Sequence, residues 1–300
     1  MSIFKLPPWI IPHLYADRNF SELSQEEVNE LKERLSKFRS TDPEVSIVVP
    51  AWNEEGCIHK TLSSLASNIT SKNVEIIVVN NNSTDTTQEI LDRLNVKSLL
   101  QVLQGPSHAR QMGLENAKGK FHLCADSDTL YPPEWIDSMV KPMKDDPEIV
   151  GVYGRYSFVP GEKQSRLSFF FYETLTSVLI KIRKPRHEFI NVLGFNMGFV
   201  TEIGKTGSGF KVKRARIYDN ALGSEYFVDE AEDGTMALNL LTKGRLKQLT
   251  GNDTRAFTSS RRLRAEGGIF RSFQNRLKLH GNNAINYISN GLRSKRSNNT

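Results

Sequence analysis

The sequence predicts an α/β protein in which a mostly parallel, twisted β-sheet is flanked by helices. Two observations lead to this prediction. Short apolar runs alternate with segments in which apolar residues recur every three or four positions, which is the pattern of consecutive βαβ units. In addition, the runs at 45–49 and 74–79 are apolar almost throughout, as expected for parallel strands that are covered on both faces.

The first expected element is a helix that begins after Ser24. Ser24 and Glu27 have the spacing of a capping box, in which each side chain bonds the backbone N–H of the other residue. The apolar residues that share one face of this helix are Val28, Leu31 and Leu35. We interpret residues 1–43 as a helical N-terminal extension that precedes the main domain and packs against it.

The sheet is expected to follow in chain order. Strands are predicted at 45–50, 74–79, 98–103 and 121–125, and helices at 58–69, at about 86–94 and at 108–117. Pro50 is expected to end the first strand, because proline lacks the N–H that a ladder needs. Ile69 has helical spacing from Leu65, so we expect it on the buried face of its helix.

The composition is that of an ordinary globular protein, since 38% of the 300 residues are hydrophobic and 25% are charged. Two cysteines provide no disulfide framework, which fits a reducing compartment. There is no basic leader followed by an uninterrupted apolar core. The apolar segment 167–182 is interrupted by Glu173 and is too short to cross a bilayer. We therefore expect a cytoplasmic protein.

The positive charge of the chain is concentrated toward residue 300. Residues 254–300 contain ten Lys or Arg and one acid, a net charge of +9, whereas the whole chain carries +6. Such a segment can bind an anionic membrane, nucleic acid or phosphorylated substrates, or it can simply be solvated. We interpret 259–300 as a basic, partly helical C-terminal segment, solvated from Arg293 onward, and do not expect nucleic acid as a partner.

Three polar segments follow the predicted strands, at 50–55, 80–85 and 126–128. Carboxyl ends of parallel strands meet at one edge of a sheet, where α/β proteins bind ligands, so these segments are expected to share a cleft. Asp126 and Asp128 point the same way if their segment is extended, and such a pair suits a hard divalent cation. The alternative is that either carboxylate caps the next helix or turn. The sequence contains neither a P-loop nor a dinucleotide fingerprint after these strands.

Four ordered motifs connect this cleft with a known family. They are Val48–Glu55, Ile77–Asp85, Ala109–Gly113 with Ala117–Gly119, and Asp126–Asp128. In these motifs the chain resembles the family 2 glycosyltransferases, and the last one stands where that family has its Asp-x-Asp motif. The resemblance implies a GT-A fold. It implies a catalytic domain at 44–258, with a nucleotide-binding half at 44–158 and an acceptor half at 159–258.

The resemblance also implies donor-binding residues. Pro50, Trp52 and Glu54 would line the pocket for the base and ribose, and Arg110 would approach the base or the diphosphate. The alternative for Arg110 is an exposed arginine on a helix.

The same resemblance implies a metal site, and in one of the motifs the chain differs from the family. Asp126 would hold the ribose, and Asp128 would bind Mn²⁺ or Mg²⁺ on the donor's diphosphate, with Asp126 beside it. Asn81 stands where the family has an Asp that contacts the base, because Asn80-Asn81-Asn82 replaces Asp-Asp-Gly. An amide donates as well as accepts, so a different edge of the base can be recognised. We favour UDP over GDP as the donor nucleotide.

Glu232-Asp233 matches the acidic pair of the family. The resemblance implies that Asp233, in preference to Glu232, is the general base that deprotonates the acceptor. Asp229 and Glu230 are weaker candidates for this role. Alternatively, these acids stabilise the start of the helix that follows.

Two further segments are matched more weakly. Gly194 and Asn196 correspond to the family's segment beside the donor sugar and acceptor, although a packed Asn in a buried strand explains Asn196 nearly as well. Arg262 and Arg264 resemble a late arginine element and would clamp the diphosphate. Ala265 stands at the tryptophan position of that element, which argues against a processive polysaccharide synthase.

These expectations define a metal-dependent, inverting, non-processive glycosyltransferase. It would move a sugar from a nucleoside-diphosphate donor to a hydroxyl of a glycan or lipid-linked saccharide, as in cell-envelope polysaccharide synthesis. A helix within 166–183 either roofs the acceptor site or lies on an anionic membrane, peripheral at its inner face. Two alternatives are a non-catalytic nucleotide-sugar or membrane-binding module and a sugar-phosphate nucleotidyltransferase. The Gly-rich loop of the latter is missing after the first strand.

Overall fold

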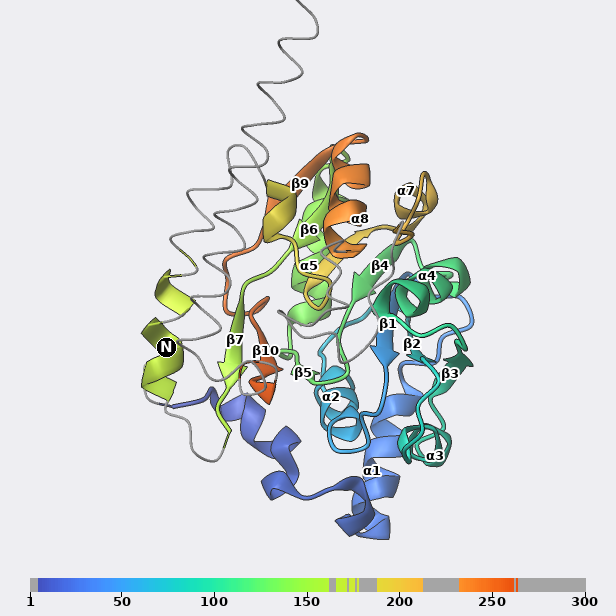
Figure 1. Cartoon of the computed structure of the whole chain (residues 1–300), viewed down its shortest axis with the longest axis vertical. Coiled ribbons are helices and arrows are strands. Elements are labelled where there is room, and N and C mark those ends of the chain that lie inside the picture. The colour runs from blue at the N-terminus through green and yellow to red at the C-terminus, as the bar shows by residue number, and fades with distance from the viewer. Residues whose placement is uncertain are drawn as a thin grey trace, which may run out of the picture.

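The computed structural model describes residues 5–161, 166–171, 173–175, 177, 188–212, 232–261 and 263. Its centre is a seven-stranded sheet with the order β3-β2-β1-β4-β8-β6-β9 (Figure 1). The strands are β1 Val45–Ala51, β2 Val74–Asn80, β3 Lys97–Leu100, β4 Phe121–Cys124, β6 Ile149–Tyr153, β8 Met197–Val200 and β9 Arg245–Gln248. Of these described strands, β8 runs antiparallel to β4 and β6, and the other pairings are parallel. The prediction of a mostly parallel sheet is confirmed.

Helices cover both faces of this sheet. The described helices are α1 Gln25–Ser36, α2 Ile58–Leu65, α3 Thr87–Arg93, α4 Pro106–Asn116, α5 Trp135–Asp145, α7 Thr201–Lys205 and α8 Glu232–Leu241. Alternate residues of β1 point to opposite faces. Ile47 therefore packs in the core cluster that contains α2 and α5, whereas Val48 packs against α4. At that contact a Cβ on Gly113 would lie 2.2 Å from a methyl group of Val48, so α4 lies directly on the sheet.

The first helix begins where the sequence predicts. The Ser24 hydroxyl accepts the N–H of Glu27 at 3.2 Å, and the Glu27 carboxylate accepts the N–H of Ser24 at 2.8 Å. Its apolar face, together with Phe20 and Phe38, is buried in the same cluster as β1 and β2. Short 3₁₀ helices at Pro8–Asp17 and Phe20–Glu22 precede it. The division of the chain at residue 43 stays a prediction.

Three predicted element ends were wrong. β1 continues through Pro50 to Ala51. Val48 accepts the N–H of Ala125, so its backbone faces β4. Pro50, two residues later, faces the same side, but β4 has ended there, so the N–H that proline lacks is not needed for a ladder bond. α2 stops at Leu65, and Ile69 is 71% exposed instead of buried.

The third correction concerns β3, which ends at Leu100 and not at 103. Val102 and Leu103 are more than half exposed. Leu103 instead donates its N–H to the side chain of Gln101, in a loop that leaves the sheet.

A second, three-stranded sheet is formed by β5 Thr129–Leu130, β10 Ala256–Ser259 and β7 Tyr156–Val159. β10 lies between the other two, antiparallel to β5 and parallel to β7. The N–H of Ser259 donates to the carbonyl of Asp128 at 3.0 Å. The small sheet therefore brings the chain after residue 256 next to the Asp126–Asp128 loop.

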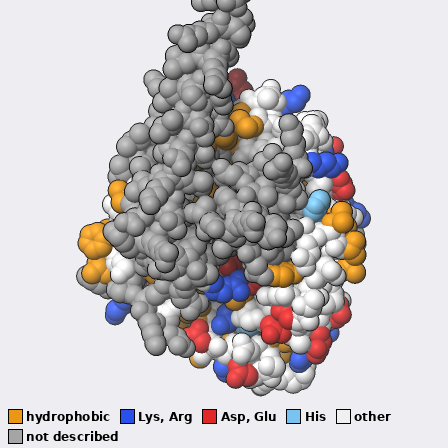
Figure 2. All heavy atoms as spheres, in the orientation of Figure 1, with side chains coloured by type: hydrophobic (Ala, Val, Ile, Leu, Met, Phe, Trp, Pro, Cys, Tyr) orange, Lys and Arg blue, Asp and Glu red, His pale blue; other side chains and the backbone are white. Residues whose placement is uncertain are grey.

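Residues 166–171, 173–175 and 177 are helical, and we call them the 166–177 segment. Its buried side carries Arg166 and Glu173, which pair at 2.6 and 2.8 Å and bind β7 through the N–H of Phe158. Its outer side carries Leu167, Phe171 and Leu175, which are exposed. In Figure 2 hydrophobic side chains gather at the left margin, where this segment lies in Figure 1. None of the described helices is long and apolar enough to cross a membrane.

The buried histidines of this fold should make it sensitive to acid. His122 in β4 is fully buried and stacks on Phe199 at 4.6 Å, and neither ring nitrogen has a hydrogen-bond partner among the described residues. Burial, helped by Arg110 and Lys205, lowers its pKa to about 3. Between about pH 6.5 and pH 3 the unfolded chain therefore binds a proton at His122 that the fold excludes, and this residue alone lowers the free energy of unfolding by about 1.4 kcal/mol for each pH unit below 6.5.

We expect His122→Leu to reduce the proton uptake on unfolding at pH 5 by about one. The measurement is the pH dependence of the free energy of unfolding in urea from pH 7.5 to 5. His108, a histidine on the first turn of α4, provides the control as His108→Gln. An unchanged slope in His122→Leu would show that His122 is already protonated in the fold.

Candidate functional site

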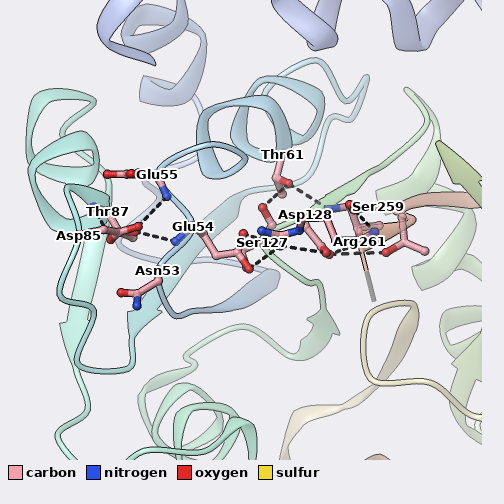
Figure 3. Close-up of polar contacts among 12 residues, drawn as sticks. Asn53, Glu54, Glu55, Thr61, Asp85, Thr87, Ser127, Asp128, Ser259 and Arg261 are labelled. Atoms are coloured by element: carbon pink, nitrogen blue, oxygen red, sulfur yellow. Dashed lines mark hydrogen bonds and ion pairs between the residues drawn. The ribbon is translucent and has the colours of Figure 1, made fainter. Parts of the chain in front are cut away.

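The polar loops after β1 and β2 are joined by hydrogen bonds (Figure 3). The N–H of Glu54 donates to the hydroxyl of Thr87 at 2.8 Å, and the N–H of Glu55 donates to the carboxylate of Asp85 at 3.1 Å. These bonds pair the backbone N–H groups of Glu54 and Glu55, so the position of Glu54 is set by the end of the β2–α3 loop and the first residue of α3.

Arg261 connects Glu54 to the third loop. Its Nη2 atom lies 2.8 and 2.7 Å from the two carboxylate oxygens of Glu54 and 3.1 Å from Oδ2 of Asp128 (Figure 3). The two carboxylate side chains are only 14% and 17% exposed. The predicted convergence of the loops after β1 and β4 is thus present, and a guanidinium group joins them.

The charges of this cluster perturb one another. Burial raises the pKa of Glu54 to about 7, against the opposing effect of Arg261, and the nearby Asp128 raises it further. Burial works against the charge of Arg261, but Glu54 and Asp128 more than compensate and raise the pKa of Arg261 above its usual value. The guanidinium therefore stays charged.

A second guanidinium lies deeper in the molecule. Arg110 in α4 is 4% exposed, and its Nη2 atom lies 2.5 Å from Oδ1 of Asp126. Its Nε atom lies 3.7 Å from the carboxylate of Glu232. Burial opposes its charge, but Asp126 and other acidic neighbours raise its pKa. The alternative of an exposed helix arginine is ruled out.

Asp233 is held beside this guanidinium by backbone groups. Its carboxylate accepts the N–H of Gly194 at 2.9 Å and the N–H of Gly234 at 2.8 Å. A Cβ on Gly194 would lie 2.9 Å from the guanidinium carbon of Arg110, so glycine lets the backbone lie against Arg110. Asp126, Arg110, Gly194 and Asp233 therefore form one connected group.

Asn81 holds a loop of the protein itself. Its side chain is fully buried, and its amide donates to the carbonyls of Gln101 and Leu103 at 2.8 and 2.6 Å. Its carbonyl oxygen accepts the N–H of Gly105 at 2.8 Å. Both amide hydrogens are thus used on the loop that leads into α4, which explains why an amide, and not a carboxylate, stands here.

Asn196 is likewise engaged inside the fold. It is 1% exposed, accepts a hydrogen bond from Trp135 Nε1 at 2.9 Å and donates to the carbonyls of Arg155 and Thr254. This arrangement favours the packed asparagine over the sugar contact.

The remaining predicted donor residues lie at or near the first loop or outside the described chain. Pro50 is buried in β1, and Trp52 is half-buried just after it. The residues that lie outside the described residues are Arg262, Arg264, Asp229 and Glu230.

Arg261 is the site residue that the sequence did not identify. It belongs to the arginine cluster at 261–264, and this cluster is the feature of the sequence from which its role could have been predicted. Its partners are 133 and 207 positions away in the chain, and only the pairing of β10 with β5 brings them together.

The carboxylates of these loops fit a divalent cation of the Mg²⁺ or Mn²⁺ type. Asp126, Asp128 and Glu54 provide the oxygen ligands that hard cations prefer. Among the residues that the structure describes, no three His, Cys, Asp or Glu side chains form a ready-made metal cage. Mg²⁺ does not need one, because it is usually bound by one or two carboxylates together with substrate phosphates.

We expect Asn81→Asp to destabilise the protein by about 3 kcal/mol, because a buried carboxylate would face two carbonyl oxygens without a proton to donate. Urea unfolding at pH 8 measures this. Asn82→Asp, at an exposed position with φ of 61° that Asp tolerates, is the matched control and should cost less than about 0.5 kcal/mol. Equal stability of the two variants would refute the role given to Asn81.

Comparison with known proteins places these motifs in one family. The model of glycosyl transferase family 2 matches residues 46–203. The glycosyltransferase GlyA of Streptococcus pneumoniae is 31% identical over 126 residues, which cover 40% of this chain and 18% of GlyA. The putative glycosyltransferase EpsH of Bacillus subtilis is 34% identical over 113 residues, which cover 36% of this chain and 33% of EpsH. The match thus spans a third or less of these relatives.

Solved structures support the fold. The crystal structure of S. aureus TarS 1–349 in complex with UDP has a TM-score of 0.51 and 22% identity, and the match covers 72% of this chain and 60% of that one. At this identity the likeness concerns the fold alone, and it agrees with the expected GT-A architecture.

Proposed function

The chain belongs to glycosyl transferase family 2, and from that premise we propose that it transfers a sugar from a nucleoside-diphosphate donor to a hydroxyl group of an acceptor. The observation that carries this proposal is the group of acids at the carboxyl edge of the sheet. Arg110 bonds Asp126 and lies 3.7 Å from Glu232, the neighbour of Asp233. Arg261 bonds both Asp128 and Glu54.

In this proposal Asp128, with Asp126 beside it, holds Mn²⁺ or Mg²⁺. When bound, the cation neutralises the diphosphate and stabilises it as a leaving group. The charge-assisted bond from Arg110 holds Asp126 in place. Arg262 and Arg264 are proposed to contact the same diphosphate.

Asp233 is the proposed general base, and Glu232 is its neighbour. Both oxygens of Asp233 accept backbone N–H groups, which fixes the carboxylate without neutralising it. A carboxylate held in this way can accept the proton of an acceptor hydroxyl as that oxygen attacks the sugar carbon. Attack from the face opposite the diphosphate would invert the configuration, and one sugar would be added at each encounter.

The base pocket is proposed to lie at Pro50 and Trp52, beside the loop that Asn81 holds. A half-buried ring such as that of Trp52 can pack on a base. We favour uracil over guanine, as the sequence suggests, and propose that Asn81 acts on the pocket through the position of its loop.

The acceptor is proposed to be a saccharide or a lipid-linked saccharide of the cell envelope. Leu167, Phe171 and Leu175 form an exposed apolar stripe, and residues 254–300 carry a net charge of +9. An apolar stripe and a basic segment together favour binding at the anionic inner face of a membrane.

The donor site can be tested by thermal shift and by turnover. Asp128→Asn should remove the Mn²⁺-dependent rise in Tm with UDP and lower transfer at least about 10³-fold, since the diphosphate loses its cation. Asp233→Asn should lower transfer about 10²- to 10⁴-fold and keep the rise in Tm, because a base is needed only for the reaction. The assay measures sugar transfer and UDP release with a panel of UDP- and GDP-sugars.

Asp145→Asn, at an exposed position in α5, is the control and should behave as the wild type. Full activity in both site variants would show that the acids are wrongly assigned. A rise in Tm without turnover on any donor would favour a non-catalytic binding module.

Membrane binding is tested separately. Replacement of Leu167, Phe171 and Leu175 by Ser should weaken co-sedimentation with anionic phosphatidylglycerol vesicles about tenfold at low salt, because the apolar contribution is lost. Leu238→Ser, at an exposed apolar position on α8, is the control. Unchanged binding would remove the stripe from the proposal, and no binding by the wild type would argue against a lipid-linked acceptor.

A further inference from the structure

We propose that Arg261 is a built-in counter-ion that holds Glu54 and Asp128 when no donor is bound and competes with the divalent cation for Asp128. Donor binding then moves the guanidinium from the carboxylates to the diphosphate. The inference rests on the proposed donor site, because it concerns how that site is kept closed and opened.

The geometry is that of a single group serving two acids. Nη2 of Arg261 contacts both oxygens of Glu54 and Oδ2 of Asp128, at 2.7 to 3.1 Å. The other oxygen of Asp128 receives only long contacts from the hydroxyls of Thr129 and Thr258, at 3.3 and 3.5 Å. The strongest partner of Asp128 among the described residues is therefore this guanidinium.

The cluster of Glu54, Asp128 and Arg261 contains one more acidic than basic side chain. At the pH 8 of the test below, Glu54 and Asp128 carry two negative charges at side chains that are 14% and 17% exposed, and Arg261 supplies one positive charge. Asp126 does not draw on it, because Arg110 is its own partner. Two nearly buried carboxylates with one cation favour a second positive charge, but a cation at Asp128 would lie close to Arg261 and be repelled by it.

Arg261 is placed so that it can leave. Its side chain is 41% exposed, compared with 5% for Arg110. It lies just after β10, where its N–H is held by the hydroxyl of Ser259, so the side chain can turn while the backbone stays fixed. Guanidinium groups form charge-assisted bonds with phosphate oxygens as they do with carboxylates. A diphosphate therefore offers Arg261 an alternative partner when the cation takes Asp128.

Coupling between the two ligands follows. Mn²⁺ alone has to take Asp128 from Arg261, which then stays on Glu54 close enough to repel the cation, whereas a nucleoside diphosphate bound with Mn²⁺ gives Arg261 a new partner away from Asp128. Each ligand should therefore strengthen the binding of the other by the same factor.

The test measures binding of Mn²⁺ by electron paramagnetic resonance of the free ion, with and without UDP, at pH 8. Arg261→Gln should bind Mn²⁺ alone about tenfold more tightly than the wild type, and the strengthening of Mn²⁺ binding by UDP should fall about tenfold or more. Arg261→Lys, which keeps the charge but presents one compact ammonium group, should lie between the two. Arg245→Gln, an exposed arginine on β9, is the matched control and should leave both values unchanged.

The outcomes separate this inference from the proposed function. If the wild type binds Mn²⁺ with UDP and Arg261→Gln gains no affinity for Mn²⁺ alone, Arg261 is not a competitor and only the inference fails. If Mn²⁺ binds neither the wild type nor any variant, with or without UDP, the donor site itself is wrongly placed and both fail. Thermal melting confirms that each variant is folded, and a misfolded Arg261→Gln leaves Arg261→Lys to decide, since it too must gain affinity.

Discussion

The pairing of nearly buried carboxylates with guanidinium groups is the interaction on which the site depends. Asp126 meets Arg110, and Glu54 and Asp128 meet Arg261, at the edge of a sheet whose central strands β1 and β2 are buried throughout. Leaving the buried charge of Arg110 without Asp126 would cost several kcal/mol. The pairs therefore require that α4, the β1–α2 loop and the chain after β10 keep their positions together, although they come from distant parts of the sequence.

Much of the fold could be predicted because its signals are local. The capping box at Ser24 and the apolar runs of β1 and β2 depend on neighbouring residues, and these elements begin where the sequence places them. The ends of α2 and β3 could not be predicted, since spacing alone does not show that Ile69 and Leu103 remain in water. The small sheet was missed because its strands are two to four residues long and pair with residues a hundred or more positions away.

The candidate site divides in the same way. Glu54, Asp126 and Asp128 follow strands, so a parallel sheet predicts their meeting. The position of Arg261 could not be predicted in this way, because it depends on the pairing of β10 with β5. For Asn81, the sequence shows that an amide replaces the acid of the family motif but does not show why. The bonds from its amide to the carbonyls of Gln101 and Leu103 supply the reason. The roles of Arg262 and Arg264 stay predictions.

Gly113 links the packing of the core to the chemistry of the site. It lies three residues after Arg110 on α4, and the missing Cβ lets the helix lie directly on Val48. A larger residue would lift the helix and carry the guanidinium away from Asp126, although position 113 itself touches none of the acids. An engineer who searches for altered donor preference should therefore expect harmful substitutions well away from the acidic loops, and should keep this helix contact intact while varying those loops.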